Sequence, residues 1–234
     1  CANACVGGQG VKDAQETVAL AASKLKLQRD EVLIASTGMI GVELPMALIR
    51  KGIGQIAVSR NSGHDLARAI MTTDTRSKEI ALSLELGGKV VKLGGIAKGS
   101  GMIHPNMGTM LSFVTTDAAV EKGFLQQALR EAVDSSFNMI TVDGDTSTND
   151  TVLLLANGAS GSKPIASGDP EAPLFARAIK EVCVYLAKQI VLDGEGATKL
   201  IEVVVEGART IADARLVAKT IASSSLVKTA VHGE

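Results

Sequence analysis

The chain has 234 residues, enough for one large domain or two small ones with a sizeable core. Hydrophobic residues make up 46% of the chain and aromatic residues 2%, so we expect a core of aliphatic side chains, alanine and methionine. A net charge of -1 gives no basic surface to attract nucleic acid, and no apolar run approaches the roughly 20 residues that span a bilayer. We therefore expect a compact soluble protein that binds neither nucleic acid nor membrane.

Helical periodicity and β-rich runs alternate in the first third of the chain. The glycines at positions 7–10 predict a loop before the first helix, and they lack the third glycine and the preceding strand of a dinucleotide-binding fingerprint. The β-rich run Val32–Thr37 ends at Gly38, which predicts a strand followed by a turn. We expect a helix over 12–25, a strand over 32–37, helices over 45–50 and 65–69, and a strand over 70–73.

The rest of the chain continues this mixture. Asp117 can cap a helix that runs to about Ser135, because apolar residues recur there at helical spacing. Residues 160–173 are rich in glycine, serine and proline and predict an exposed loop. We also expect strands over 90–96, 110–116, 139–142, 151–156 and 199–205, and helices over 173–191 and 211–227. The alternation predicts an α/β fold.

The cysteines are few and odd in number: Cys1, Cys5 and Cys183. This argues against a disulfide framework and fits a reducing compartment, so we expect a cytoplasmic protein. Cys1 and Cys5 have no histidine or second cysteine pair nearby, so no metal site is expected. Cys183 lies on the apolar face of a predicted helix and is expected in the core.

The stretch Lys98–Phe113 combines a glycine-rich loop with an apolar strand. Its glycines and proline argue against regular structure before Gly108, and the run 110–114 predicts a buried strand. Thr109 lies at the junction. A threonine hydroxyl is a weak nucleophile unless a base lies beside it, and an N-terminal threonine can use its own α-amine. That would require a break between Gly108 and Thr109; the simpler interpretation of these residues alone is a surface turn before a core strand.

The same stretch resembles the self-cleavage signature of the ornithine acetyltransferases, also called bifunctional glutamate N-acetyltransferases of arginine biosynthesis. Members of that family carry Lys-Gly-x-Gly-Met-Ile-x-Pro-Asn-Met-Ala-Thr-Met-Leu, and this chain departs from it by Gly108 in place of the usual alanine. That departure leaves open whether this bond is cut. Four further blocks follow the family's order along the chain: Ala35–Gly41, Ala69–Thr75, Asp143–Asp150 and Asp193–Thr198. Five ordered blocks make the resemblance highly specific.

The resemblance implies that the chain is cut between Gly108 and Thr109. Residues 1–108 would then belong to an α chain and residues 109–234 to a β chain, which stay associated as an (αβ)2 heterotetramer or a larger assembly. Both parts are expected to be incomplete at their outer ends, because the first and last residues fall inside the family's pattern. The implied fold is α/β, with two mixed β-sheets packed together and helices outside.

The resemblance also implies a mechanism. Thr109 would take acetyl from N-acetylornithine as an acetyl-threonine and pass it to glutamate in ping-pong fashion, without a cofactor. Acetyl-CoA as a further acetyl donor stays open. Thr37 and Gly38 would form the oxyanion hole. The implied substrate contacts are Thr72 (or Thr75, because the spacing varies), Lys98, Thr109 and Glu195.

Several alternatives accompany this interpretation. A related aminopeptidase or amidase would use the same nucleophile with water as the acceptor, and a silent homologue would serve only in assembly. The acidic block Asp143–Asp150 suggests a cation loop, but it lacks the later glutamate of an EF-hand, and the resemblance makes it a buried structural loop beside the active site. His104 precedes Thr109 by five positions and suggests a catalytic base, but the family motif varies at this position.

Overall fold

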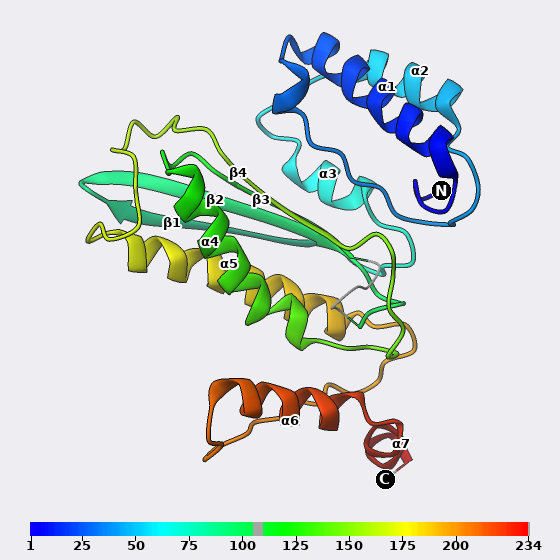
Figure 1. Ribbon diagram of the computed structural model, residues 1–234, viewed down its shortest axis with the longest axis vertical. Helices are drawn as coiled ribbons and strands as arrows, with labels where there is room; N and C mark the ends of the chain where they lie inside the picture. The colour runs from blue at the N-terminus through cyan, green and yellow to red at the C-terminus, as the bar shows by residue number, and fades with distance from the viewer. Residues whose placement is uncertain (105–109, 234) are drawn as a thin grey trace.

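The computed structural model describes residues 1–104 and 110–233, and its centre is a four-stranded β-sheet (Figure 1). The strands are β1 (Lys78–Leu86), β2 (Lys89–Lys98), β3 (Leu111–Thr116) and β4 (Thr151–Ala156), in that spatial order. β2 is antiparallel to both β1 and β3, whereas β4 runs parallel to β3. The mixed sheet and its helices confirm the α/β class.

Helices α4 (Lys122–Asp134) and α5 (Ala172–Leu192) pack against each other and cover one face of the sheet (Figure 1). α5 approaches β2 so closely that a Cβ atom at Gly95 would lie 2.6 Å from a Val182 methyl group. Each large apolar side chain that is fully buried in such a core contributes roughly 1.5–3 kcal/mol. The predicted apolar face of α5 is confirmed as core: Phe175, Ile179, Val182, Cys183, Leu186 and Ile190.

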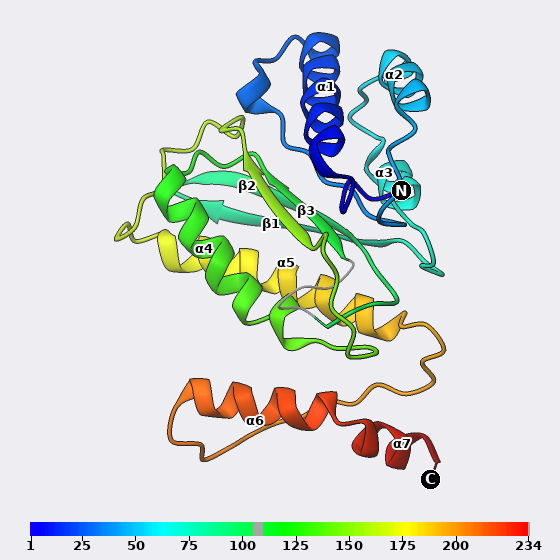
Figure 2. The same ribbon diagram turned by 45° about the vertical axis from the view of Figure 1, so that its right-hand side comes forward.

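The other helices lie in two groups at opposite ends of the molecule (Figure 2). The N-terminal group contains α1 (Gly7–Leu25), η1 (Arg29–Glu31), α2 (Met46–Gln55) and α3 (Gly63–Ala69). The C-terminal group, below α5 in the view, contains α6 (Ile211–Ser223) and α7 (Ser225–Gly233), and a short turn, η2 (Phe137–Met139), follows α4. Within the described ranges, no helix has the length and apolar character to cross a membrane.

The predicted helices are confirmed, with changes at their ends. The glycines at 7–10 form the first turn of α1 and not a loop. Helix α4 begins at Lys122, because the Asp117 carboxylate instead accepts a hydrogen bond from the Lys92 N–H at 2.7 Å. The last predicted helix breaks at Ser224 into α6 and α7.

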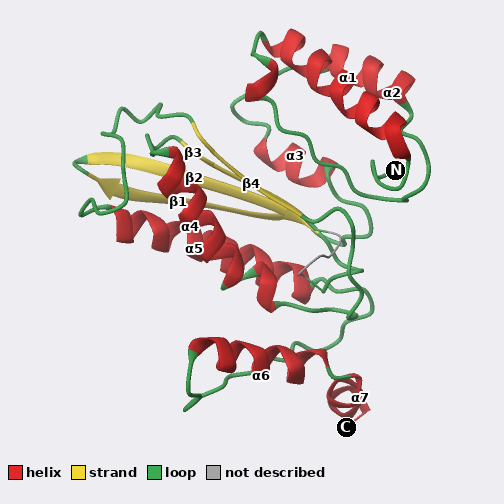
Figure 3. Cartoon of the chain, viewed as in Figure 1, coloured by secondary structure: helices red, strands yellow, loops and turns green. Residues whose placement is uncertain are grey.

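Four predicted strands are wrong. The segments 32–37, 70–73, 139–142 and 199–205 belong to no strand of the described structure (Figure 3). A β-rich run becomes a strand only where a partner strand supplies hydrogen bonds and packing, and Leu33 and Val204 remain 55% and 73% exposed. The prediction also misses β1, although every second residue from Ile80 to Leu86 is apolar.

The sandwich of two sheets is not seen in the parts of the chain that the structure describes, where all four named strands form one sheet. The face of this sheet opposite α4 and α5 carries apolar side chains that remain open to solvent. Val90 is 62% exposed and Leu155 is 42% exposed. Alternation along β2 directs Lys98 toward this same face.

Candidate active site

Strand register brings the ends of three strands together at one end of the sheet. Lys98, the last residue of β2, pairs with Leu111, the first residue of β3. Leu111 in turn pairs with Thr151, the first residue of β4. The predicted lysine and the start of the strand after the predicted cleavage site are therefore neighbours, although they come from opposite sides of that site.

The predicted cleavage pair, Gly108 and Thr109, lies outside the described residues. The next residue, Met110, is buried, and its backbone N–H donates a hydrogen bond to Asp150 Oδ1 at 2.7 Å. The other carboxyl oxygen of Asp150 is buried without a hydrogen-bond partner among the described atoms. Burial raises the pKa of Asp150 to about 7, although the bond from Met110 opposes the shift. Asp150, with one carboxyl oxygen hydrogen-bonded and the other not, thus holds the start of the strand that follows Thr109.

Lys98 is 2% exposed at the end of β2. Its Nζ lies 3.9 Å from Asp74 Oδ2, an ion pair too long for a hydrogen bond. Burial lowers the pKa of Lys98, the Asp74 carboxylate opposes this shift, Lys78 adds to it, and Glu195 opposes it. The lysine ammonium therefore lies in the field of two carboxylates without a close bond to Asp74.

The carboxylate of Asp74 organises the loop before β1. It accepts hydrogen bonds from the Thr72 N–H at 3.2 Å and from the Gly99 N–H at 2.6 Å. Burial alone would raise the pKa of Asp74, but the bonds from Gly99, Lys78 and Thr72 outweigh burial and lower it. Asp74 therefore caps the turn at Thr72 and also joins that turn to the backbone directly after Lys98.

The two candidate threonines for substrate contact have different surroundings. The Thr75 hydroxyl and N–H both donate to the buried carboxylate of Asp193, so the side chain of Thr75 already has a partner. Thr72 is held by its backbone, and the residue is exposed. This arrangement favours Thr72 as the threonine that is available to a ligand.

Glu195 lies against the glycine loop that follows Lys98. Its N–H donates to the Ser100 carbonyl oxygen at 2.8 Å. A Cβ atom at Gly101 would lie 2.5 Å from the carboxyl carbon of Glu195 and 2.6 Å from its oxygens. Glycine at position 101 therefore allows the glutamate to approach the backbone, and it brings the predicted substrate residues Lys98 and Glu195 into one region.

The predicted oxyanion pair lies on a segment that borders the start of β4. Gly38 has a φ of +133°, a backbone conformation that other residues rarely adopt. The Thr37 hydroxyl oxygen is buried and has no hydrogen-bond partner among the described atoms. The preceding residue, Ser36, lines a cavity of about 220 Å³ together with Asp150 and Thr151. The segment that carries Thr37 and the start of β4 at Asp150 and Thr151 therefore border the same small cavity.

The acidic block at 143–150 supports the glycine loop. The two carboxylate oxygens of Asp143 accept hydrogen bonds from the N–H groups of Met102 (2.5 Å) and Ile103 (3.0 Å). Asp143 is exposed, so this end of the block is not buried as the resemblance implied. His104 Nδ1 lies 3.0 Å from the Thr141 hydroxyl, and burial lowers its pKa.

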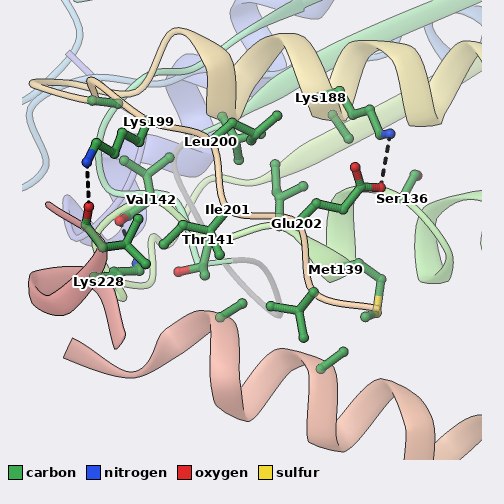
Figure 4. A pocket seen from close by; sticks show the side chains of 18 of the residues that line it. Ser136, Met139, Thr141, Val142, Lys188, Lys199, Leu200, Ile201, Glu202 and Lys228 are labelled. Carbon is green, nitrogen blue, oxygen red and sulfur yellow. Dashed lines mark hydrogen bonds and ion pairs between the residues drawn. The ribbon is translucent and has the colours of Figure 1, made fainter. Parts of the chain in front are cut away.

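A separate cavity of about 370 Å³ lies between the end of α5, the segment after Glu195, and α6 and α7 (Figure 4). Lys188 and Glu202 face each other across one side of it, 3.4 Å apart, and Lys228 Nζ donates to the Val142 carbonyl oxygen at 2.7 Å. None of the predicted site residues in the described ranges lines this cavity. The candidate site is therefore the region around Lys98, Thr72 and Glu195.

Two of the residues that organise this region were not named by the sequence interpretation. Asp150 was treated only as part of its block, although its position just before a strand parallel to β3 could have indicated contact with Met110. Asp193 was treated likewise, and no local signal marks its contact with Thr75, which is 118 positions away.

The sequence matches the model of the ArgJ family over residues 1–234. It is 57% identical to the arginine biosynthesis bifunctional protein ArgJ of Symbiobacterium thermophilum and 55% identical to that of Dehalococcoides mccartyi; both matches cover 100% of this chain and 58% of the relative. The crystal structure of arginine biosynthesis bifunctional protein argJ from Bacillus halodurans is similar, with a TM-score of 0.50 at 51% identity over 52% of this chain and 57% of that one. The chain thus spans 58% of the length of these curated relatives.

Proposed function

The chain belongs to the ArgJ family, and from this premise we propose that it is the catalytic part of a self-cleaving N-acetyltransferase that moves acetyl from N-acetylornithine to glutamate. The observation that carries the proposal is the family match over the whole chain, with the motif from Lys98 to Phe113 intact except at Gly108. The relatives' names, which assign them to arginine biosynthesis, support this pair of substrates.

We propose that cleavage creates the nucleophile. The Thr109 hydroxyl attacks the Gly108 carbonyl carbon, the peptide becomes an ester, and water hydrolyses the ester to leave a free Thr109 amine. Residues 1–108 and 109–234 then belong to α and β chains that assemble as (αβ)2 or a larger oligomer. The hydrogen bond from Met110 to Asp150 supports this step, because it fixes the strand that begins directly after the new chain end.

Acetyl transfer follows in two half-reactions. The Thr109 amine takes the proton of the Thr109 hydroxyl, whose oxygen attacks the acetyl carbon of N-acetylornithine; ornithine leaves with that proton. The glutamate amine then attacks the acetyl carbon of the acetyl-threonine, the bond from that carbon to the Thr109 oxygen breaks, and the Thr109 amine carries the proton of the glutamate amine to this oxygen as N-acetylglutamate leaves. Thr37 and Gly38 stabilise the oxyanion in both halves, a contribution of about 3–4 kcal/mol for each donor.

Opposite charges at the site suit an amino-acid substrate. The Lys98 ammonium and the Glu195 carboxylate are held within one region by the glycine loop, so they are placed to bind the carboxylate and the side-chain ammonium of N-acetylornithine, the two charged ends of that zwitterion. Thr72, exposed on the neighbouring loop, supplies a hydroxyl. No cofactor is required; acetyl-CoA would be an alternative acetyl donor at the same threonine.

We propose that the whole enzyme folds as a sandwich of two sheets. We also propose that it works in the cytoplasm. The open apolar face of the sheet, with Val90 and Leu155, supports a second layer there. The extended segment 32–37, which exposes apolar side chains, is the candidate for a strand of that layer once the remaining length found in the relatives is present.

The decisive experiment is intact-mass analysis of the full-length protein beside Thr109→Ala. We expect two chains from the wild type, one beginning at Thr109, and a single chain from the variant. Assays with N-acetylornithine and glutamate then identify the reaction. Hydrolysis of aminoacyl amides without dependence on glutamate would indicate a peptidase instead. A single uncut wild-type chain without transfer would indicate a silent assembly subunit.

A further inference from the structure

A lysine at the start of β1 is completely enclosed. The side chain of Lys78 has no exposed surface, and its Nζ donates to Asp74 Oδ1 at 2.6 Å and to Asp193 Oδ2 at 2.5 Å. A third contact, to the Arg76 carbonyl oxygen, is 3.5 Å long. Both carboxylates are also buried. A buried ion pair is costly to form, so its position in the fold calls for an explanation.

The two carboxylates that Lys78 joins belong to different parts of the candidate site. Asp74 accepts the N–H groups of Thr72 and Gly99, so it sets the backbone on which Thr72 lies and the backbone directly after Lys98. It is also the ion-pair partner of Lys98, at 3.9 Å.

Asp193 holds the other side of the site. It accepts the N–H and the hydroxyl of Thr75, and two residues later the chain reaches Glu195, whose N–H is bound to the Ser100 carbonyl oxygen. Through these two carboxylates, Lys78 therefore connects the loop that carries Thr72, the end of β2 at Lys98 and the turn that carries Glu195.

We propose that Lys78 is a positioning residue for the amino-acid substrate, an inference that rests on the proposed acetyl transfer. By bridging Asp74 and Asp193, it sets the separation between the Lys98 ammonium and the Glu195 carboxylate, and hence the length of the zwitterionic substrate that fits between them. It also occupies Asp74, which leaves Lys98 at ion-pair distance and able to bind a substrate carboxylate.

Loss of Lys78 should change both the separation of the Lys98 and Glu195 side chains and the distance between Lys98 and Asp74. Two buried carboxylates without a shared cation repel each other, so the turn before Glu195 moves away from Asp74. Asp74 Oδ1 then keeps only its bond from the Gly99 N–H, and the carboxylate has lost its close cation, so Lys98, already at ion-pair distance, is the cation within its reach among the described residues. A closer pair between them withdraws the Lys98 ammonium from the substrate, which weakens substrate binding more than it slows the chemical step.

A purely structural role for Lys78 is the rival explanation, and a second substitution separates the two. The four charges of Lys78, Lys98, Asp74 and Asp193 sum to zero. Lys78→Met leaves an unbalanced negative charge, whereas Lys78→Met combined with Asp193→Asn restores the balance without restoring the bridge. If Lys78 only stabilises the fold, the double variant regains both stability and activity.

The experiment uses the full-length protein as wild type, Lys78→Met, Lys78→Arg and the double variant. Lys188→Met, which removes a lysine from an exposed ion pair, is the matched control. The melting temperature, self-cleavage, and kcat and KM for N-acetylornithine and glutamate are measured. We expect the double variant to regain its melting temperature but to lose about 100-fold in kcat/KM, mostly through KM, and Lys78→Arg to retain more activity than Lys78→Met.

The outcomes are separable. A double variant with wild-type KM values, or a loss of kcat alone, would overturn the positioning role while acetyl transfer stands. If Lys78→Met does not fold, the double variant still decides. A wild-type enzyme that is cleaved but transfers no acetyl would overturn the proposed function, and the positioning role with it.

Discussion

Two sets of acids lie at the same end of the sheet, the buried pair Asp74 and Asp193 and the half-buried Asp150, and their surroundings affect them in opposite ways. Asp74 and Asp193 share the Lys78 ammonium and accept further N–H and hydroxyl donors, and these bonds lower the pKa of both despite burial. Asp150 accepts one N–H, and burial raises its pKa to about 7. The number of donors, and not burial, separates a fixed charge from a group that titrates near neutral pH.

The largest expected effect comes from removing a fixed charge. Asp193→Ala takes away one partner of Lys78 and both bonds to Thr75, and breaking a buried pair costs about 3–5 kcal/mol. Urea denaturation of the full-length protein measures the free energy of unfolding. The matched control is Glu202→Ala, which breaks the exposed pair with Lys188 and should change stability by less than about 1 kcal/mol. Equal losses of stability in the two variants would contradict the difference we expect between the buried and the exposed ion pair.

A smaller effect, on binding alone, is expected at the glycine loop. In Gly101→Ala the new methyl group would lie 2.5 Å from the Glu195 carboxyl carbon, and this exposed, flexible side chain must move. We expect KM for the amino-acid substrate to rise about tenfold with little change in melting temperature. Gly52→Ala, where a methyl group meets nothing within 4 Å, should leave KM unchanged. An unchanged KM in Gly101→Ala would argue against Glu195 as a substrate contact.

The two threonines of the Asp74 loop should respond differently. Thr75→Ala removes a hydrogen bond to the charged Asp193 and should destabilise the protein by about 1.5 kcal/mol. Thr72→Ala should leave stability within about 0.5 kcal/mol and raise KM instead. Thermal unfolding and steady-state kinetics on both variants test this assignment; the reverse pattern would make Thr75 the substrate contact.

The smallest effect concerns pH. Because the folded pKa of Asp150, about 7, is above the ordinary value of 3.8, its contribution to stability is present in acid and is lost as the pH rises through about 7. Asp74 and Asp193 behave oppositely, and their contribution is lost only as the pH falls below 3.8.

Between pH 5 and 8 the wild type should therefore lose about 1 kcal/mol, a value discounted for partial solvent exposure, while Asp150→Asn shows no such loss. Unfolding free energies across this range provide the measurement. Arg130→Gln, at the cavity that Asp150 also borders, is the control for a change of charge there. A wild-type slope retained in Asp150→Asn would assign the titration to another group.

The sequence predicted the helices well because their signal is local. The apolar face of α5 follows a period of 3.6, and each residue on it was placed correctly in the core. Strands were harder, since the segments 32–37 and 199–205 have the composition of strands but no partner in the described structure. A strand depends on pairing, which a single segment does not specify.

The site was predicted through a motif and not through contacts. Lys98, Thr72 and Glu195 were identified because they match a family pattern, and the structure brings them to one end of the sheet. Lys78 has no such signal: it joins Asp74, four positions before it, to Asp193, 115 positions after it. Only the folded chain reveals a contact across that separation.

The order of the strands has a consequence for how the two proposed chains are made. The proposed cut between Gly108 and Thr109 would fall between β2 and β3, which pair from Lys98↔Leu111 to Leu93↔Thr116. The backbone ladder at the centre of the sheet would then become the seam between two polypeptides. Either half alone would present an unpaired, apolar strand edge, a template for aggregation. Synthesis as one chain would let this seam close before the new ends are released, so each α chain would pair with its β chain without an encounter between separate polypeptides.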